Sequence, residues 1–262
     1  MALALSDLCI VVASNDEACL QRNLLASPLV AAGVAVHIEC GAPSAAVAYN
    51  RGLVATTAPL VIFAHQDVWF PPGWEMRLSQ AIAQLKAKGE PWALLGPFGM
   101  STDGRHLGDV WSTSIGRRVG LAVATPVPVQ SFDELAFVMR RAAGLRFDEA
   151  LPLWHFYGTD IVQTALAAGQ GAYVFDAPLV HNDGFKGRLG DDFTQGYNFI
   201  RRKWGVKLPI RSSILWITRF GTPLWRYRFR AWRGLEKRRA LALDTSVAPQ
   251  IYAARSGITP SK

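Results

Sequence analysis

Polar side chains that could bind a cation follow the buried strands that the sequence predicts. The apolar run at 60–64 predicts a strand buried on both faces, and His65, Gln66 and Asp67 follow it directly. A later predicted strand ends in His181. Because the carboxyl ends of parallel strands line one crevice, Asp67 and His181 could share one divalent ion there, Mn²⁺ or Mg²⁺. Such an ion would neutralise a diphosphate leaving group.

Asp160 could supply acid–base chemistry beside such an ion. It stands in the first turn of a predicted helix at 158–168, where its carboxylate could take the proton from an acceptor hydroxyl. Simpler roles stay open for all of these residues. Asp160 could be an N-cap, Asp67 could cap the turn that follows it, and His65 and His181 could be histidines bonded within the fold.

An alternation of strands and helices must position these side chains. The pattern of strand, helix, strand, helix in the first hundred residues predicts a mostly parallel α/β sheet with right-handed crossovers. The predicted strands lie at 8–13, 34–40, 60–64, 92–98, 106–111, 121–129 and, with an interruption, 173–180. One predicted helix ends near residue 32, and a second includes residues 50–52. Three more are predicted at 73–88, 133–143 and 158–168. A glycine-rich loop follows at 184–190.

The composition is that of a globular protein. Of the 262 residues, 50% are apolar and 18% are charged, which excludes a disordered chain. The three cysteines form no CxxC pair, which favours a reducing, cytoplasmic environment over a disulfide framework or a zinc site. The first residues carry no basic region, and no apolar run is long enough to predict a signal peptide or a transmembrane helix.

The C-terminal part of the chain is strongly basic and aromatic. Residues 201–240 hold thirteen Lys or Arg against one acid, Glu236, although the whole chain carries a net charge of only +8. Arginines alternate with aromatic residues at 226–230, which predicts a strand or an irregular amphipathic segment, and 235–243 predicts a helix. Residues 245–262 are expected to be poorly ordered.

This basic segment suggests a partner of opposite charge. Arginine and tryptophan together favour the headgroup zone of a bilayer, so one hypothesis is a peripheral contact on the inner face of the membrane through residues 201–240. The alternative, of equal weight, is that this segment is a solvated extension packed on the body of the protein. A nucleic acid is the less favoured partner.

Several motifs together resemble a known family. A strand followed by Ser-Asn, an Asn-Arg-Gly helix, His-Gln-Asp-Val after a buried strand, and Trp-His-Phe-Tyr-Gly-Thr-Asp at 154–160 occur in order over residues 7–185. They look like a family 2-type glycosyltransferase with a GT-A fold. The likeness is nearest to the subgroup that carries His-Gln-Asp in place of Asp-x-Asp, which includes proteins of streptomycin-type biosynthesis.

The resemblance implies an inverting, metal-dependent transfer of a sugar from a nucleotide-sugar to a hydroxyl, and it assigns roles to particular residues. Asp67 and His181 would bind the metal, and Asp160 would be the catalytic base. The residues implied for the donor are Ser14, Glu39, Asn50, His65, Asp67, Lys186 and Arg188. The candidates for acceptor binding are Trp74, Trp154 and His155, with packing as the alternative for both tryptophans.

The sequence also departs from the family pattern. His65 replaces the first Asp of Asp-x-Asp, and Thr159 replaces the Glu that usually precedes the catalytic Asp. A strict Gln-x-x-Arg-Trp is absent, although Arg-Arg-Lys-Trp stands at 201–204. These departures keep open a non-catalytic relative that binds a nucleotide-sugar or glycan without turnover.

The sequence thus predicts two parts: a GT-A-like catalytic domain at 1–185 and a basic extension at 186–262. The predicted function is a hexosyl- or related transferase that acts on a glycan or lipid-linked acceptor. The alternatives are a non-catalytic binding protein and an adaptor that acts on membrane or nucleic acid through its basic tail.

Overall fold

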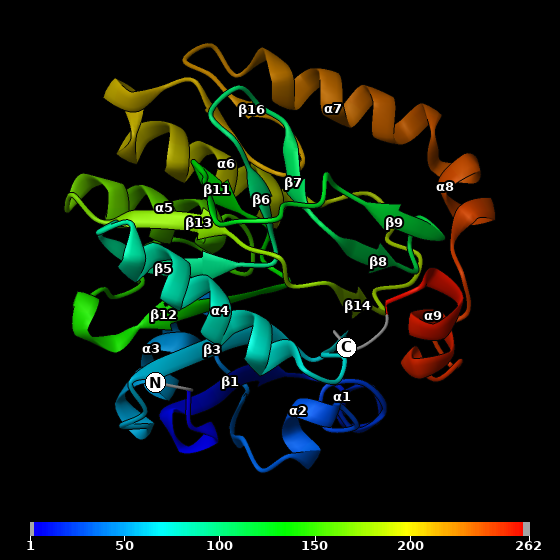
Figure 1. Cartoon of the computed structure of the whole chain (residues 1–262). Helices are drawn as coiled ribbons and strands as arrows, with labels where there is room; N and C mark the ends of the chain where they lie inside the picture. Colours follow the sequence, from blue (N-terminus) through cyan, green and yellow to red (C-terminus); the bar gives the residue numbers. More distant parts are fainter. Residues whose placement is uncertain (1–2, 259–262) are drawn as a thin grey trace.

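A mixed sheet forms the centre of the molecule in the computed structural model, which describes residues 3–258 (Figure 1). Among these residues the sheet has seven strands, of which β10 and β12 run opposite to the other five. In spatial order the strands are β10 (Val127–Pro128), β13 (Gly171–Val174), β5 (Trp92–Gly96), β12 (Ala136–Arg140), β3 (Leu60–His65), β1 (Leu8–Ser14) and β2 (Ala35–Cys40). The predicted mostly parallel α/β sheet is confirmed.

Helices cover both faces of this sheet. Alternate residues of the central strands point to opposite sides, so Val11 and Phe63 belong to one hydrophobic core and Ile10 and Ile62 to the other. Helices α3, α5 and α6 contribute to the first core, and α1, α2 and α4 to the second. The helices are α1 (Glu17–Arg22), α2 (Pro28–Ala31), α3 (Ala45–Ala55), α4 (Trp74–Ala87), α5 (Tyr157–Ala167), α6 (Asp191–Lys203), α7 (Thr222–Arg233), α8 (Leu235–Leu241) and α9 (Pro249–Ser256).

Smaller sheets extend the carboxyl-end side of the main sheet. The pairing of β14 with β4 is antiparallel and puts His181 opposite Val68, directly beside the end of β3. One small sheet contains, in spatial order, β4 (Val68–Trp69), β14 (Leu179–His181), β8 (Val110–Ser112) and β9 (Arg117–Val119). The others are β11 (Ser131–Phe132), β6 (Phe98–Met100) and β7 (His106–Gly108), and the pair β15 (Ile210–Arg211) and β16 (Trp216–Ile217).

Two predictions for the body of the protein are wrong. The segment 133–143 is not a helix, because the contiguous apolar residues of β12 insert between β3 and β5 and are buried on both faces. The single helix expected to end near residue 32 is two short helices. Asn23 turns the chain there by donating its side-chain amide to the carbonyl of Cys19, and Pro28 begins α2.

The basic segment also differs from its prediction. Residues 226–230 are part of the helix α7 and not a strand, because Leu224, Tyr227 and Ala231 recur at helical spacing and face the protein. Helix α8 confirms the helix predicted near 235–243. The expected disorder after residue 245 is wrong for α9, whose Tyr252 is buried; residues 259–262 lie outside the described part.

The boundary predicted between residues 185 and 186 stays a prediction. Phe193, Tyr197 and Ile200 of α6 belong to the same core as the central sheet, so the segment after 185 contributes to the packing of the body. Within residues 3–258, none of the helices combines the length and the apolar character needed to cross a bilayer.

Candidate functional site

Three potential metal ligands meet where β3 and β14 end. His65 is the last residue of β3, Asp67 follows in the turn, and the β4–β14 pairing brings in His181. One ligand atom from each of the three lies within 4.8 Å of the others. The Asp67 Oδ1 atom is 3.2 Å from His181 Nε2 and 3.9 Å from His65 Nδ1. The strand ends therefore bring together the two predicted metal ligands and add a third.

Two of these ligand atoms lack a hydrogen-bond partner within the described part of the chain. Asp67 Oδ1 and His181 Nε2 are both buried, and the line between them does not have hydrogen-bond geometry despite the short distance. Buried polar atoms are nearly always paired, so two orphaned atoms that face each other need an explanation. Two imidazole nitrogens and a carboxylate oxygen suit a divalent transition ion such as Mn²⁺, and the residues therefore fit a metal site.

The charges of the cluster are strongly coupled. Burial alone would lower the pKa of His181, but the carboxylates of Asp183 and Asp67 outweigh it and raise that pKa to about 9. Burial lowers the pKa of His65 to about 4, although Asp67 opposes this shift. Burial would raise the pKa of Asp67, yet His181, His65 and Lys186 together lower it. At neutral pH the cluster therefore holds a carboxylate between one charged and one neutral imidazole.

The ring of His65 is held by a tyrosine that the sequence analysis did not single out. Tyr157, the first residue of α5, donates its hydroxyl proton to the backbone carbonyl of Glu134 at 2.8 Å. The same hydroxyl is 2.8 Å from His65 Nε2 and must therefore accept a proton from it. This hydrogen bond places the proton of neutral His65 on Nε2 and leaves the lone pair of Nδ1 directed to the cluster.

Removing the Tyr157 hydroxyl tests this positioning role. We expect Tyr157→Phe to weaken Mn²⁺ binding about 10- to 100-fold, because the orientation and tautomer of His65 are no longer fixed. Titration calorimetry with Mn²⁺ measures the effect. Tyr49→Phe is the matched control, since the Tyr49 hydroxyl is 3.3 Å from that of Tyr157 and makes no bond to His65. Equal losses in the two variants would contradict the role of Tyr157.

A cavity of about 370 Å³ opens on one side of the cluster. Gln66, which the sequence analysis left without a role, organises its floor: its Oε1 accepts from Ser14 Oγ at 2.7 Å and from the backbone of Asn15. Lys186 stands at the rim with its Nζ 3.7 Å from Asp67 Oδ2. The cavity is lined by Ala13, Ser14, Asn15, Glu39, Gly41, Ala42, His65, Gln66, Asp67, Trp154 and Lys186. Most of the residues predicted for the donor therefore share one cavity.

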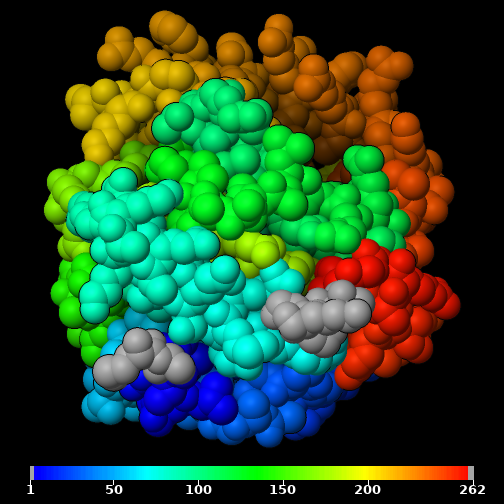
Figure 2. Space-filling view, in the orientation of Figure 1, coloured from blue at the N-terminus to red at the C-terminus, as the bar shows by residue number. Residues whose placement is uncertain are grey.

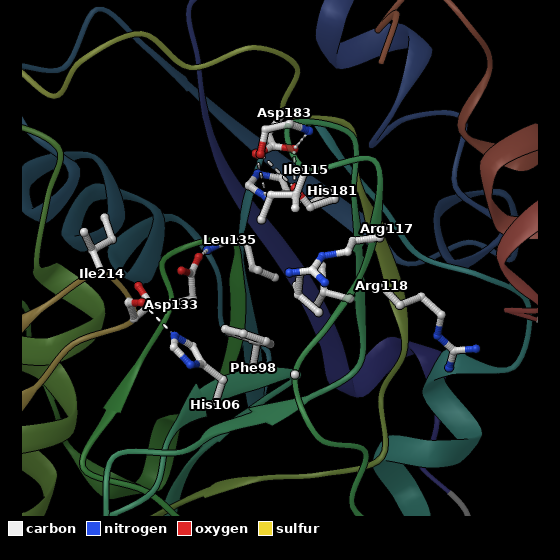
Figure 3. Close-up of a pocket in the computed structure, with 16 residues that line it drawn as sticks. Phe98, His106, Ile115, Arg117, Arg118, Asp133, Leu135, His181, Asp183 and Ile214 are labelled. Atoms are coloured by element: carbon white, nitrogen blue, oxygen red, sulfur yellow. Dashed lines mark hydrogen bonds and ion pairs between the residues drawn. The ribbon is translucent and has the colours of Figure 1, made fainter. Parts of the chain in front are cut away.

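A second cavity of about 630 Å³ reaches the cluster through His181 (Figure 3). Its walls are largely apolar, with Phe98, Leu135 and Ile115 among them, and two carboxylates, Asp133 and Asp183, also line it. Asp183 accepts hydrogen bonds from Ser112 Oγ and the Ser114 backbone, both at 3.0 Å. Asp133 accepts only a 3.3 Å bond from the Leu135 backbone among the described residues, so its carboxylate is the freer of the two.

Two predicted site residues, Trp74 and Asp160, are buried. Trp74 is fully buried in the core against Phe70 and Phe175, so the prediction that it binds an acceptor is wrong. Asp160 is only 2% exposed. Its two oxygens accept from Lys203 Nζ at 2.8 Å and Trp204 Nε1 at 2.7 Å, and it does not line either cavity at the cluster. This enclosed, paired carboxylate has no open side for an acceptor in the structure, and its general-base role stays a prediction.

Three other predicted residues lie outside the two cavities. Asn50 bridges to the backbone of Phe147 and lines a separate pocket beside α3. His155 lies 3.2 Å from a carboxylate oxygen of Asp192. Arg188 is an exposed residue of the loop at 184–190 and does not line either cavity. The donor and acceptor roles of these three residues stay predictions.

The two histidines give the metal-free protein an expected stability maximum near pH 6.5. The raised pKa of His181 contributes stability that is complete below 6.5, its ordinary value, and is lost as the pH rises through about 9. The lowered pKa of His65 acts in the opposite direction, with stability lost as the pH falls from 6.5 toward about 4.

Urea unfolding in EDTA between pH 4 and pH 10 measures this profile. We expect the free energy of unfolding to fall by roughly 1–3 kcal/mol between pH 6.5 and pH 9.5. In His181→Asn the alkaline decrease should disappear while the acidic decrease remains. A wild-type profile that is flat above pH 6.5 would contradict the charged state assigned to His181.

Comparisons with known proteins give distant likenesses. No protein-family model matches the chain. A curated protein described as "ATP synthase subunits region ORF 6" from Fuscovulum blasticum is 28% identical over 159 residues, which are 55% of this chain and 60% of that protein's length. Among solved structures, GalNAc-T7 with UDP, GalNAc and Mn²⁺ has a TM-score of 0.49 and 10% identity, over 97% of this chain and 55% of that one.

A second solved structure spans the chain to a similar extent. The mannosyltransferase PcManGT from Pyrobaculum calidifontis, in complex with GDP-Man and Mn²⁺, has a TM-score of 0.46 and 14% identity, over 96% of this chain and 76% of that one. These values are low, so the function has to be inferred from the site itself.

Proposed function

We propose that the chain is a metal-dependent glycosyltransferase of GT-A type that moves a sugar from a nucleotide-sugar to an acceptor hydroxyl. The observation that carries this proposal is the cluster of His65, Asp67 and His181 between two cavities, in which the buried ligand atoms of Asp67 and His181 face each other. The cluster lies at the carboxyl end of a mostly parallel sheet, where α/β proteins bind ligands. The motifs that carry the family resemblance contribute these three residues.

His65, Asp67 and His181 would hold the ion, and Mn²⁺ suits them better than Mg²⁺ because two of the three ligands are imidazoles. When bound, the metal would neutralise the charge that develops on the diphosphate leaving group. His181 must give up its proton to become a ligand, since its pKa is about 9. Asp183, 3.9 Å from His181 Nδ1, then keeps the ring oriented.

The smaller cavity suits the nucleotide part of the donor. Lys186, more than half exposed on its loop, can turn from Asp67 to the diphosphate oxygens. Glu39, at the end of β2, can accept hydrogen bonds from a ribose, and His37 is 2.6 Å from its carboxylate and fixes its position. Trp154, 40% exposed at the rim, offers an apolar face to a sugar or base. These contacts would place the anomeric carbon beside the cluster.

The larger cavity would then receive the acceptor. Because Asp160 is enclosed, we assign the base to Asp133, which lines this cavity and is near enough to raise the pKa of His181. Its carboxylate would take the acceptor proton as the oxygen attacks the anomeric carbon, giving inversion. The apolar walls of Phe98, Leu135 and Ile115 favour an acceptor with an apolar part, such as a lipid-linked glycan.

A thermal-shift panel tests the proposal. Wild-type protein is heated with UDP, GDP, dTDP or CMP and their sugars, with Mn²⁺ or with EDTA. At a hundredfold excess over the dissociation constant, one nucleotide should raise the unfolding temperature by about 5–10 °C with Mn²⁺ and by much less with EDTA. If none of the nucleotides shifts the transition of a folded sample, the proposal is wrong.

Binding without turnover is the second candidate, and the burial of Asp160 favours it because the residue in the family's catalytic position is not available. The two functions differ in one measurement. A transferase slowly hydrolyses its nucleotide-sugar when no acceptor is present, and a pure binding protein leaves it intact. Release of the nucleoside diphosphate over hours, with and without Mn²⁺, therefore separates them.

A further inference from the structure

Helix α7 has one face packed on the protein and one face in solvent. Leu224, Tyr227 and Ala231 form the inner face and pack against the protein. The helix runs along one edge of the molecule, with α8 continuing past it (orange in Figures 1 and 2). Gly221, with φ of +70°, precedes it, and Pro223 lies in its first turn. The outer face is therefore presented by a helix with defined ends.

This outer face is aromatic where a solvated helix would be polar. Trp225, Phe229 and Trp232 are 70%, 47% and 61% exposed, and their spacing of four and three residues puts them on one stripe. The ring centroids of Trp225 and Phe229 are 6.1 Å apart, and those of Phe229 and Trp232 are 6.3 Å apart. Phe220, just before the helix, is 82% exposed. A contiguous apolar patch of this kind marks an interaction surface.

Positive charge surrounds the aromatic stripe. On α7 the exposed cations are Arg226, Arg228, Arg230 and Arg233. Among the described residues none of these four forms an ion pair, and Glu236, the only acid between 201 and 240, pairs with Arg239. In a helical projection Arg228 lies on one side of the stripe and the other three on the opposite side. A partner complementary to this face therefore has an apolar layer for the aromatic stripe and negative charge beside it for the arginines.

We propose that α7 docks this face on an anionic lipid surface. The helix would lie flat in the interface, with Trp225, Phe229 and Trp232 at the level of the acyl boundary and the flanking arginines on lipid phosphates. A lipid fits better than a single-stranded nucleic acid, because the rings form a ridge on a convex helix and proteins that bind single strands use a groove. Membrane docking does not depend on glycosyl transfer, because the experiment below measures only the binding of the protein to vesicles.

Vesicle flotation is the experiment. Full-length protein is mixed with vesicles of phosphatidylcholine alone or with a third phosphatidylglycerol. We expect the wild type to float with the anionic vesicles only, and Trp225→Ser/Phe229→Ser/Trp232→Ser to bind at least about tenfold more weakly. The matched control is Met76→Ser/Leu121→Ser/Leu166→Ser, which removes three exposed apolar side chains elsewhere and should bind like the wild type.

A second variant tests the charge. Arg226→Glu/Arg230→Glu/Arg233→Glu should abolish binding to the anionic vesicles. Circular dichroism confirms that each variant is folded, and Trp225→Ser alone replaces the aromatic triple should the triple not fold. Three results would overturn the proposal: wild-type protein that does not bind anionic vesicles, aromatic variants that bind as well as the wild type, or an oligonucleotide that binds this face while vesicles do not.

Discussion

Replacing Asp67 with alanine is expected to lower kcat/KM for glycosyl transfer by about 10³-fold or more. A catalytic metal contributes several kcal/mol to the transition state, and each 1.36 kcal/mol is a factor of ten in rate. Asp67 is the central member of the cluster, since its Oδ1 atom faces both His65 and His181. Without it only the two imidazoles of the cluster remain to hold the ion. Transfer assays over a range of Mn²⁺ concentrations measure the loss.

A matched control separates the metal site from general effects of charge removal. Asp103→Ala removes an exposed carboxylate that pairs with Arg105 on the surface, and transfer should stay within about twofold of the wild type. Asp67→Asn keeps the shape of the side chain and controls for packing. If Asp67→Ala transfers sugar at a rate near that of the wild type with unchanged Mn²⁺ dependence, the cluster is not the metal site.

Replacing Asp133 with asparagine is expected to lower kcat by about 10² to 10⁴, the usual contribution of a general base. The carboxylate lines the larger cavity and accepts a single weak backbone bond among the described residues. Asparagine keeps that bond but cannot take a proton. The KM for the nucleotide-sugar should change little, because the nucleotide is expected in the other cavity.

The split between kcat and KM distinguishes a base from a positioning residue. In Asp133→Asn the loss should fall on kcat and leave the Mn²⁺ affinity unchanged, whereas a variant that only disturbs the cavity would also raise the KM for the acceptor. Asp160→Asn is the instructive comparison. It should reduce stability through loss of the bonds to Lys203 and Trp204 and leave kcat close to that of the wild type. A large loss of kcat in Asp160→Asn with none in Asp133→Asn would instead identify Asp160 as the base.

The metal cluster could be predicted from the sequence because it follows from a local rule. Contiguous apolar runs identify the buried strands β1 and β3, and polar residues at their carboxyl ends must share a crevice. That reasoning found Asp67 and His181 without knowledge of the pairing between β4 and β14. Ser14 and Glu39, which the family resemblance implied for the donor, line the smaller cavity beside the cluster.

The other features of the fold and of the site could not be predicted, because they depend on which distant segments of the chain come into contact. β12 follows Asp133 and Glu134, which resemble the start of a helix. The segment is a strand because it pairs with both β3 and β5. Asp160 has the position of a catalytic carboxylate in its motif, yet the partners that enclose it come from 43 and 44 residues further along the chain. Gln66 and Tyr157 act through hydrogen bonds to residues that are distant in the sequence, so these bonds are evident only in the folded structure.

The place of β12 in the sheet also bears on how the protein is made. β3 and β5 are both hydrogen-bonded to β12, which comes forty residues after β5 ends and runs opposite to both. A chain that leaves the ribosome from its N-terminus therefore carries the β12-facing edges of β3 and β5 without a partner until about residue 140 has emerged, and the other edge of β5 has none until β13 follows. During that time the nascent chain is exposed to aggregation and open to chaperones. The order of strands thus makes folding of the N-terminal half wait for a segment from the second half.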